Sequence, residues 1–107
     1  MDRKTILIAD DDVNLMRALA VRLEAEGYRC ICTQDGYFAV AQALKEQPDL
    51  LLLDVNMPAG DGFSVRKRLL EATPPVKTPV VYITGERFDA VSESAASLGA
   101  SHVLPKP

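Results

Sequence analysis

The chain has 107 residues, the size of one domain, so we predict a single domain over residues 1–107. Hydrophobic residues make up 48% of it and charged residues 25%, a balance that excludes disordered, collagenous and fibrous proteins. The net charge of -3 argues against the basic surface that nucleic-acid binding needs, so we expect no direct nucleic-acid partner.

Five short apolar runs along the chain predict β-strands. Four of them are nearly unbroken, which is typical of strands covered on both faces of a parallel sheet. The first run is too short for a signal-peptide core or a membrane span, so we expect a cytoplasmic protein without membrane contact. In chain order the predicted strands are 6–9, 28–32, 50–53, 80–83 and 103–104.

The stretches between these runs have helical periodicity. The first places Met16, Leu19, Ala20 and Leu23 on one face of a helix that Gly27 ends. Further helices are predicted over 36–46, 62–71 and 87–98. The residues expected to face inward on them are Ala39, Val40, Ala43, Leu44, Phe63, Leu69, Leu70, Val91, Ala95 and Leu98.

The alternation of strands and helices predicts an α/β fold. Its sheet should be parallel, with right-handed crossovers and helices on both faces. Only Pro105, Lys106 and Pro107 follow the last predicted strand, so a fifth helix is missing where the alternation would place one. We therefore expect an apolar surface of the sheet that this chain leaves uncovered. Either a partner covers this surface, or the sequence has been truncated before the missing helix.

The two cysteines, Cys30 and Cys32, lie two positions apart in a predicted strand. This spacing suits neither a disulfide framework nor a zinc site. We expect both thiols to be reduced and partly buried.

Chemically distinctive residues follow four of the predicted strands. Asp10, Asp11 and Asp12 follow the first, Asp54 the third, Thr84 the fourth and Lys106 the fifth. The carboxyl ends of parallel strands share one edge of the sheet, where open α/β sheets bind ligands. Clustered carboxylates repel one another, and an all-oxygen, half-open site favours Mg²⁺. A carboxylate there can act as nucleophile toward a phosphoryl group, with Lys106 and Thr84 contacting the phosphoryl oxygens.

Each of these residues also has an ordinary structural interpretation. An acidic run before a helix often caps it, and we expect Asp12 to do so. Thr84 alone would be read as a turn residue and Lys106 alone as a solvated charge. Asp54 is harder to explain structurally, because a charge directly after an apolar strand is costly to bury. The joint occurrence of these residues favours a functional site.

The chain resembles the receiver domain of two-component response regulators along its whole length. The matching segments are 6–12 (ILIADDD), 53–62 (LDVNMPAGDG), 82–85 (YITG) and 99–101 (GAS), the last leading to Lys106 and Pro107. The resemblance implies a flavodoxin-like fold with strand order 2-1-3-4-5. It also implies a signalling phosphoacceptor, which catalyses its own phosphorylation and dephosphorylation, more than an enzyme.

The resemblance assigns a role to each residue of the site. Asp54 would accept a phosphoryl group from a phosphohistidine on a sensor histidine kinase or a histidine phosphotransfer protein. Asp11 and Asp54 would ligate Mg²⁺ directly, Asn56 would offer its backbone carbonyl, and Asp10 would act through water. The resemblance further implies that Lys106 binds a phosphoryl oxygen and that Thr84 moves toward the phosphate. It also implies a small residue at the position of Gly85 and a cis Lys106–Pro107 bond.

Two departures from the family pattern leave alternatives open. Val103 stands where many receivers have an aromatic residue, and the chain stops at Pro107. A pseudo-receiver adaptor that binds a partner without phosphorylation is therefore the main alternative. A haloacid-dehalogenase-type phosphatase is disfavoured, because Asn56 stands where its second carboxylate would be. An output domain, a downstream protein and a second copy of the chain are the other partners considered.

Overall fold

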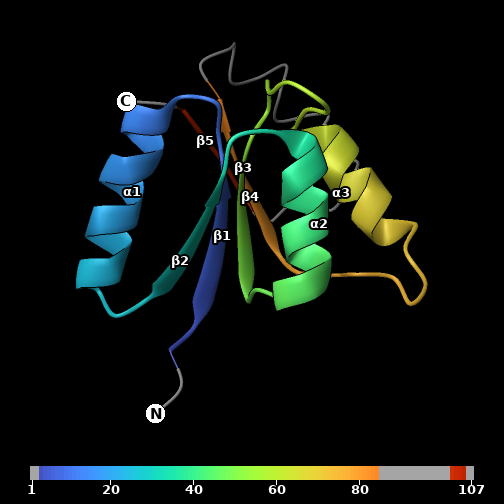
Figure 1. The fold of residues 1–107 in the computed structure, drawn as a ribbon, viewed down its shortest axis with the longest axis horizontal. Helices are drawn as coiled ribbons and strands as arrows, with labels where there is room; N and C mark the ends of the chain where they lie inside the picture. Colours follow the sequence, from blue (N-terminus) through green and yellow to red (C-terminus); the bar gives the residue numbers. More distant parts are fainter. Residues whose placement is uncertain (1–2, 85–101, 106–107) are drawn as a thin grey trace.

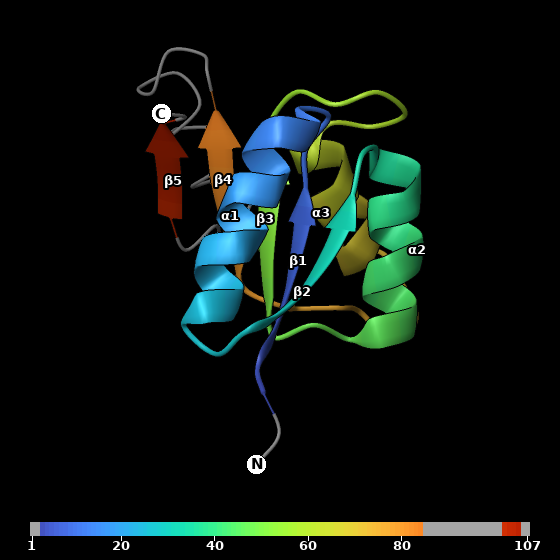
Figure 2. The same ribbon diagram turned by 60° about the vertical axis from the view of Figure 1, so that its left-hand side comes forward.

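The protein, described by a computed structural model over residues 3–84 and 102–105, contains one five-stranded parallel sheet. The strand order is β2-β1-β3-β4-β5, which confirms the predicted order, and the strand arrows run in one direction in Figure 2. The fold is a flavodoxin-like α/β fold. The strands are β1 (Thr5–Ala9), β2 (Arg29–Thr33), β3 (Leu50–Asp54), β4 (Val80–Thr84) and β5 (His102–Pro105).

Helices cover both faces of the sheet, as expected (Figure 1). Helix α1 (Val13–Ala25) lies on one face, and α2 (Gly36–Glu46) and α3 (Gly62–Leu70) lie on the other. The predicted fourth helix, over 87–98, falls outside the described residues. None of the helices in residues 3–84 and 102–105 has the length and apolar content needed to span a bilayer.

Two apolar clusters hold these layers together. On the side of α2 and α3, Leu7, Leu51 and Leu53 of the sheet are fully buried against helix residues that include Ala39 and Leu69. A smaller cluster joins the other face to α1, and it consists of Ile6, Ile8, Met16, Ala20, Leu52 and Ile83. Complete burial of one leucine side chain contributes about 1.5–3 kcal/mol. The alternation of strand side chains between the two clusters fixes the register of the sheet.

Each described helix begins after an aspartate that caps it. Asp12, Asp35 and Asp61 each accept a hydrogen bond from the backbone N–H three residues later, at 3.1, 2.9 and 2.8 Å. Such a cap stabilises a helix by about 1 kcal/mol. The predicted capping role of Asp12 is confirmed. At the other end of α1, Gly27 adopts a positive φ of 98°, as the predicted helix stop requires.

Some predictions of burial were wrong. Leu44 was expected to face the core, but its side chain is 47% exposed. The core side of α3 instead includes Val65 and Arg66, which the sequence pattern did not single out. Burial of Arg66 is tolerated because its Nη1 donates a hydrogen bond to the Thr78 carbonyl, and its aliphatic stem can pack against apolar groups.

The two cysteines lie on β2, where only one edge of the strand pairs with a described neighbour. Cys30 is half-buried as expected, whereas Cys32 is exposed, so the prediction was wrong for Cys32. Both are free thiols. Partial burial and the nearby carboxylate of Glu24 raise the pKa of the Cys30 thiol, which keeps it protonated and unreactive near neutral pH.

The Tyr82 side chain is fully buried on the α3 side of the sheet. Its ring packs against Phe63 with the centroids 4.8 Å apart. Among the described residues its hydroxyl has no hydrogen-bond partner. Burial raises the pKa of Tyr82 to about 12 from an ordinary value of 10.0, with Arg66 opposing the shift and Asp61 adding to it.

This tyrosine predicts a loss of stability at high pH. Between pH 10 and 12 it ionises in the unfolded chain while it stays protonated in the folded one, so the free energy of unfolding falls as the pH rises. Urea unfolding at pH 8 and pH 11 should show wild type losing about 1 kcal/mol more than Tyr82→Phe. Equal losses in the two proteins would show that Tyr82 ionises normally in the folded state.

Candidate functional site at the carboxyl edge of the sheet

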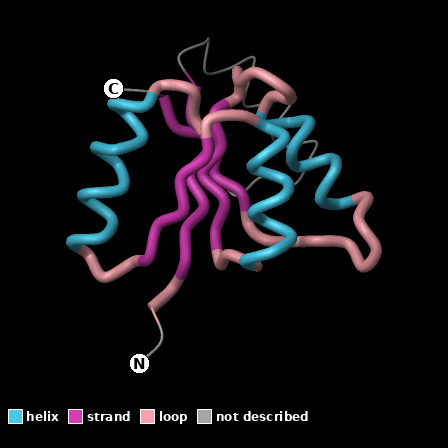
Figure 3. Tube along the Cα trace, in the orientation of Figure 1, coloured by secondary structure: helices cyan, strands magenta, loops and turns pink. Residues whose placement is uncertain are grey.

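Three aspartates meet where β1 and β3 end. These strands are neighbours, and Ala9 pairs with Leu53, so Asp10 and Asp54 follow at the same level of the sheet. One carboxylate oxygen from each of Asp10, Asp11 and Asp54 lies within 4.8 Å of the other two. Figure 3 shows the loops that leave the carboxyl ends of the strands gathered at this edge. The grouping expected from the sequence is confirmed for these three residues.

The three carboxylates differ in their access to water. Asp10 is completely buried and Asp54 is 2% exposed, whereas Asp11 is exposed. The backbone orients the buried pair: Asp12 N donates to Asp10 Oδ1 at 2.8 Å, and Asn56 N donates to Asp54 Oδ1 at 3.2 Å. Two buried carboxylates this close repel strongly unless a positive charge lies between them. The site is therefore open on the Asp11 side and closed beneath Asp10 and Asp54.

The donor set of this cluster suits a hard divalent cation. It consists of carboxylate oxygens alone, without the histidine or cysteine ligands that zinc prefers. Mg²⁺ binds through one or two carboxylates and keeps several waters, which agrees with a site that is open on one side. The cluster is thus able to hold a metal ion. Asn56, two residues after Asp54, is exposed in the following loop.

Thr84 lies at the same edge of the sheet. It is the last residue of β4 and is 1% exposed, and its neighbour Ile83 pairs with Asp54. Thr84 pairs in turn with Pro105 of β5, the residue before Lys106. Gly85, Lys106 and the Lys106–Pro107 bond fall outside the described residues, so their expected roles stay predictions.

Two glycines that sequence analysis did not assign to the site support the loop after β3. A Cβ added to Gly62 would lie 2.5 Å from the Asp54 carbonyl oxygen, and one added to Gly36 would lie 2.1 Å from that of Gly60. Gly36 N also donates to the Pro58 carbonyl at 3.0 Å. Both glycines follow an aspartate cap and begin a helix, a pattern visible in the sequence. They allow α2 and α3 to approach the backbone beside the acidic cluster.

The fold and the acidic site together agree with one family of signalling domains. Residues 6–107 match the response regulator receiver domain family. The chain belongs to this family, a component of two-component systems, and receiver domains are generally signalling modules. The family assigned by resemblance is confirmed.

Two response regulators and one solved structure are similar to this chain and agree with this assignment. The response regulator GtcR of Aneurinibacillus migulanus is 38% identical over 104 residues, which cover 97% of this chain and 42% of that protein. The response regulator PleD of Caulobacter vibrioides is 38% identical over 107 residues, covering 95% of this chain and 22% of PleD. The chain thus spans less than half the length of these relatives. The structure of Vibrio cholerae chemotaxis protein CheY4 superimposes with a TM-score of 0.90 at 28% identity, covering 99% of this chain and 88% of CheY4.

Proposed function

We propose that this chain, as one receiver domain over residues 1–107, is the phosphoacceptor of a two-component phosphorelay. Asp54 takes the phosphoryl group from a phosphohistidine on a sensor histidine kinase or a histidine phosphotransfer protein. The observation that carries the proposal is the buried carboxylate of Asp54, within 4.8 Å of the Asp10 and Asp11 carboxylates at the ligand-binding edge of the sheet. A structural role does not account for two buried acids this close together.

The proposed transfer step uses this carboxylate as the nucleophile. An Asp54 carboxylate oxygen attacks phosphorus, a new O–P bond forms, and the N–P bond of the phosphohistidine breaks. The electron pair of that bond returns to the imidazole nitrogen, and the product on this chain is an acyl phosphate. The hydrogen bond from Asn56 N holds the Asp54 carboxylate in place during the attack. The near-complete burial of Asp54 limits access of water to the product.

The neighbouring residues supply the charge that the transfer needs. Mg²⁺, held by Asp11 and Asp54 directly, by the Asn56 backbone carbonyl and by Asp10 through water, would neutralise the phosphoryl oxygens. Thr84 would donate a hydrogen bond to a phosphoryl oxygen, and Lys106 would contribute its positive charge. The change of charge at Asp54 then biases the surface that an output domain or a downstream protein contacts.

Metal dependence is the first test of this function. Incubation with labelled acetyl phosphate and Mg²⁺ should label the chain, and removal of Mg²⁺ with EDTA should lower the initial rate about 100-fold, which corresponds to roughly 3 kcal/mol of charge stabilisation. Asp11→Asn should weaken Mg²⁺ binding in a calorimetric titration. Equal labelling with and without Mg²⁺ would contradict the proposed site. If neither acetyl phosphate nor a phosphorylated kinase labels the chain, the proposal fails and an adaptor role replaces it.

A further inference from the structure

A hollow of about 440 Å³ lies at the edge of the sheet opposite the acidic cluster. It is bordered by the end of α2 and by the segment 72–78 between α3 and β4, shortly before β3 and β4 begin. Its volume is in the usual range of small-molecule sites, about 300–1,000 Å³. The described residues that line it include none of the acidic site. The hollow is thus a separate feature, which the proposed function does not use.

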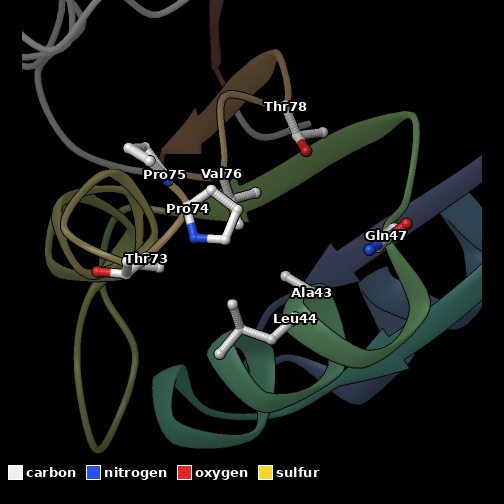
Figure 4. Close-up of a pocket in the computed structure, with 9 residues that line it drawn as sticks. Ala43, Leu44, Gln47, Thr73, Pro74, Pro75, Val76 and Thr78 are labelled. Carbon is white, nitrogen blue, oxygen red and sulfur yellow. The ribbon is translucent and has the colours of Figure 1, made fainter.

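Two apolar walls face each other across this hollow (Figure 4). Ala43 and Leu44 form one wall at the end of α2, and Pro74 and Val76 form the other. A flat ring suits the space between such walls, because both of its faces then contact apolar groups.

Hydrogen bonds hold the wall formed by the segment 72–78 in place. Val76 N donates to the Leu69 carbonyl at 2.9 Å. The buried guanidinium of Arg66 donates from Nη1 to the Thr78 carbonyl. These two bonds fix the segment at its middle and at its end. The hollow is therefore largely formed before a ligand binds, as is usual for small-molecule sites.

The backbone beside the hollow supplies hydrogen-bond acceptors without matching donors. The last carbonyls of a helix have no partner within that helix, and they are directed toward its C-terminal end. Leu44, near the end of α2, precedes Pro48 by four positions, and Leu70, the last residue of α3, precedes Pro74 by the same number. Because proline has no N–H, neither carbonyl receives the bond that a continuing helix would provide. Ligand N–H groups can take the place of these missing donors.

The charges around the hollow favour a neutral ligand. Among the described residues, those that line it carry no charged side chain. Lys45 and Lys77 are exposed next to lining residues and disfavour a cation, whereas the carbonyl ends of two helices disfavour an anion. The polar side chains of the lining, Gln47, Thr73 and Thr78, can both donate and accept hydrogen bonds.

We propose that this hollow binds a neutral planar heterocycle with N–H donors, of the type found in pyrimidine bases. The ring lies between Leu44 and Pro74. Its N–H groups donate to the carbonyls at the end of α2 and to the Gln47 side chain. The ligand is small and uncharged, so we expect a dissociation constant of roughly 1 mM.

NMR titration of the isotopically labelled chain with uracil tests the proposal. The amide signals of Leu44, Gln47 and Val76 should shift and saturate with a dissociation constant of roughly 1 mM. Dimethyluracil, in which both ring N–H groups are methylated, should bind at least about tenfold more weakly. Uridine should bind as tightly as uracil if the base arrives on a sugar, and more weakly if the free base is the ligand. Equal affinities for uracil and dimethyluracil, or no saturable shift of these signals below about 10 mM uracil, would overturn the proposal.

A variant of Gln47 tests the predicted contact. Gln47 has a positive φ of 48°, which glycine adopts freely, so Gln47→Gly removes the amide without backbone strain. Loss of this hydrogen bond should weaken uracil binding about fivefold. The matched control is Gln34→Gly, the same change at an exposed position in the loop before α2, which should bind like wild type. Asp54→Asn should also bind uracil like wild type, which separates this site from phosphoryl transfer. Wild-type affinity in Gln47→Gly, or equal weakening in Gln34→Gly, would contradict the proposed site.

Discussion

Replacement of Asp54 by asparagine is expected to abolish phosphoryl incorporation from acetyl phosphate or a phosphorylated kinase, with the rate falling at least about 1,000-fold. The amide has nearly the same shape as the carboxylate, but it lacks the anionic oxygen that attacks phosphorus. Removing one of two buried neighbouring carboxylates also relieves repulsion with Asp10, so the variant should fold at least as well as wild type. Acid-quenched labelling followed by mass spectrometry of the intact chain measures the extent of modification.

Asp12→Asn is the matched control for this experiment. Asp12 belongs to the same acidic run, but its side chain accepts a hydrogen bond from Leu15 N and caps α1. Asparagine caps a helix as well as aspartate does, so stability should be unchanged. The control should label at the wild-type rate. Wild-type labelling of Asp54→Asn would place the phosphoryl group on another residue and exclude Asp54 as the nucleophile.

The sequence predicted most of the fold because its strands are buried on both faces. Continuous apolar runs such as 50–53 mark central parallel strands, and the observed β3 (Leu50–Asp54) adds only Asp54. The predicted bounds of α2 were those observed, because an aspartate cap precedes it and Pro48 stops it. The strand order itself came from resemblance to a family, since apolar periodicity does not determine which strands are neighbours.

Burial on α2 could not be predicted in the same way. Periodicity placed Ala43 and Leu44 together on the inward face, since they are adjacent at about 100° of rotation. The small residues Ala39 and Ala43 are buried in the cluster with the sheet residues instead, which leaves Leu44 outside. Close packing of α2 against the sheet requires these small side chains. Hydrophobic periodicity assigns leucine to the core and does not take side-chain size into account.

The aspartates of the acidic site were predicted more completely than the glycines that support the loop beside it. Asp10, Asp11, Asp54 and Thr84 follow from the rule that parallel strands end at one edge, and the structure places all four there. The close approach of Gly36 to Gly60 joins residues 24 positions apart in two loops, and no local pattern predicts such a contact. Contacts of this kind depend on the relative placement of whole helices.

Gly36→Ala should be strongly destabilising, although alanine is normally favoured over glycine in a helix by about 1 kcal/mol. The added Cβ would lie 2.1 Å from the Gly60 carbonyl oxygen and 2.9 Å from that of Ala59. Both atoms belong to the backbone and cannot rotate away, so α2 or the loop after β3 must move. We expect the free energy of unfolding to fall by about 3 kcal/mol and the melting temperature by roughly 15 °C.

Gly27→Ala separates this steric effect from a general cost of replacing glycine. Gly27 has a positive φ of 98° but nothing within 4 Å of an added Cβ, so alanine there costs only backbone strain, about 1–2 kcal/mol. Urea unfolding should therefore show a larger loss for Gly36→Ala than for Gly27→Ala. Gly36→Ala should also slow labelling of Asp54, because the loop that moves contains Asn56, whose N–H orients the Asp54 carboxylate. A smaller loss of stability than in Gly27→Ala would show that the two loops separate easily, and the support assigned to Gly36 would then be wrong.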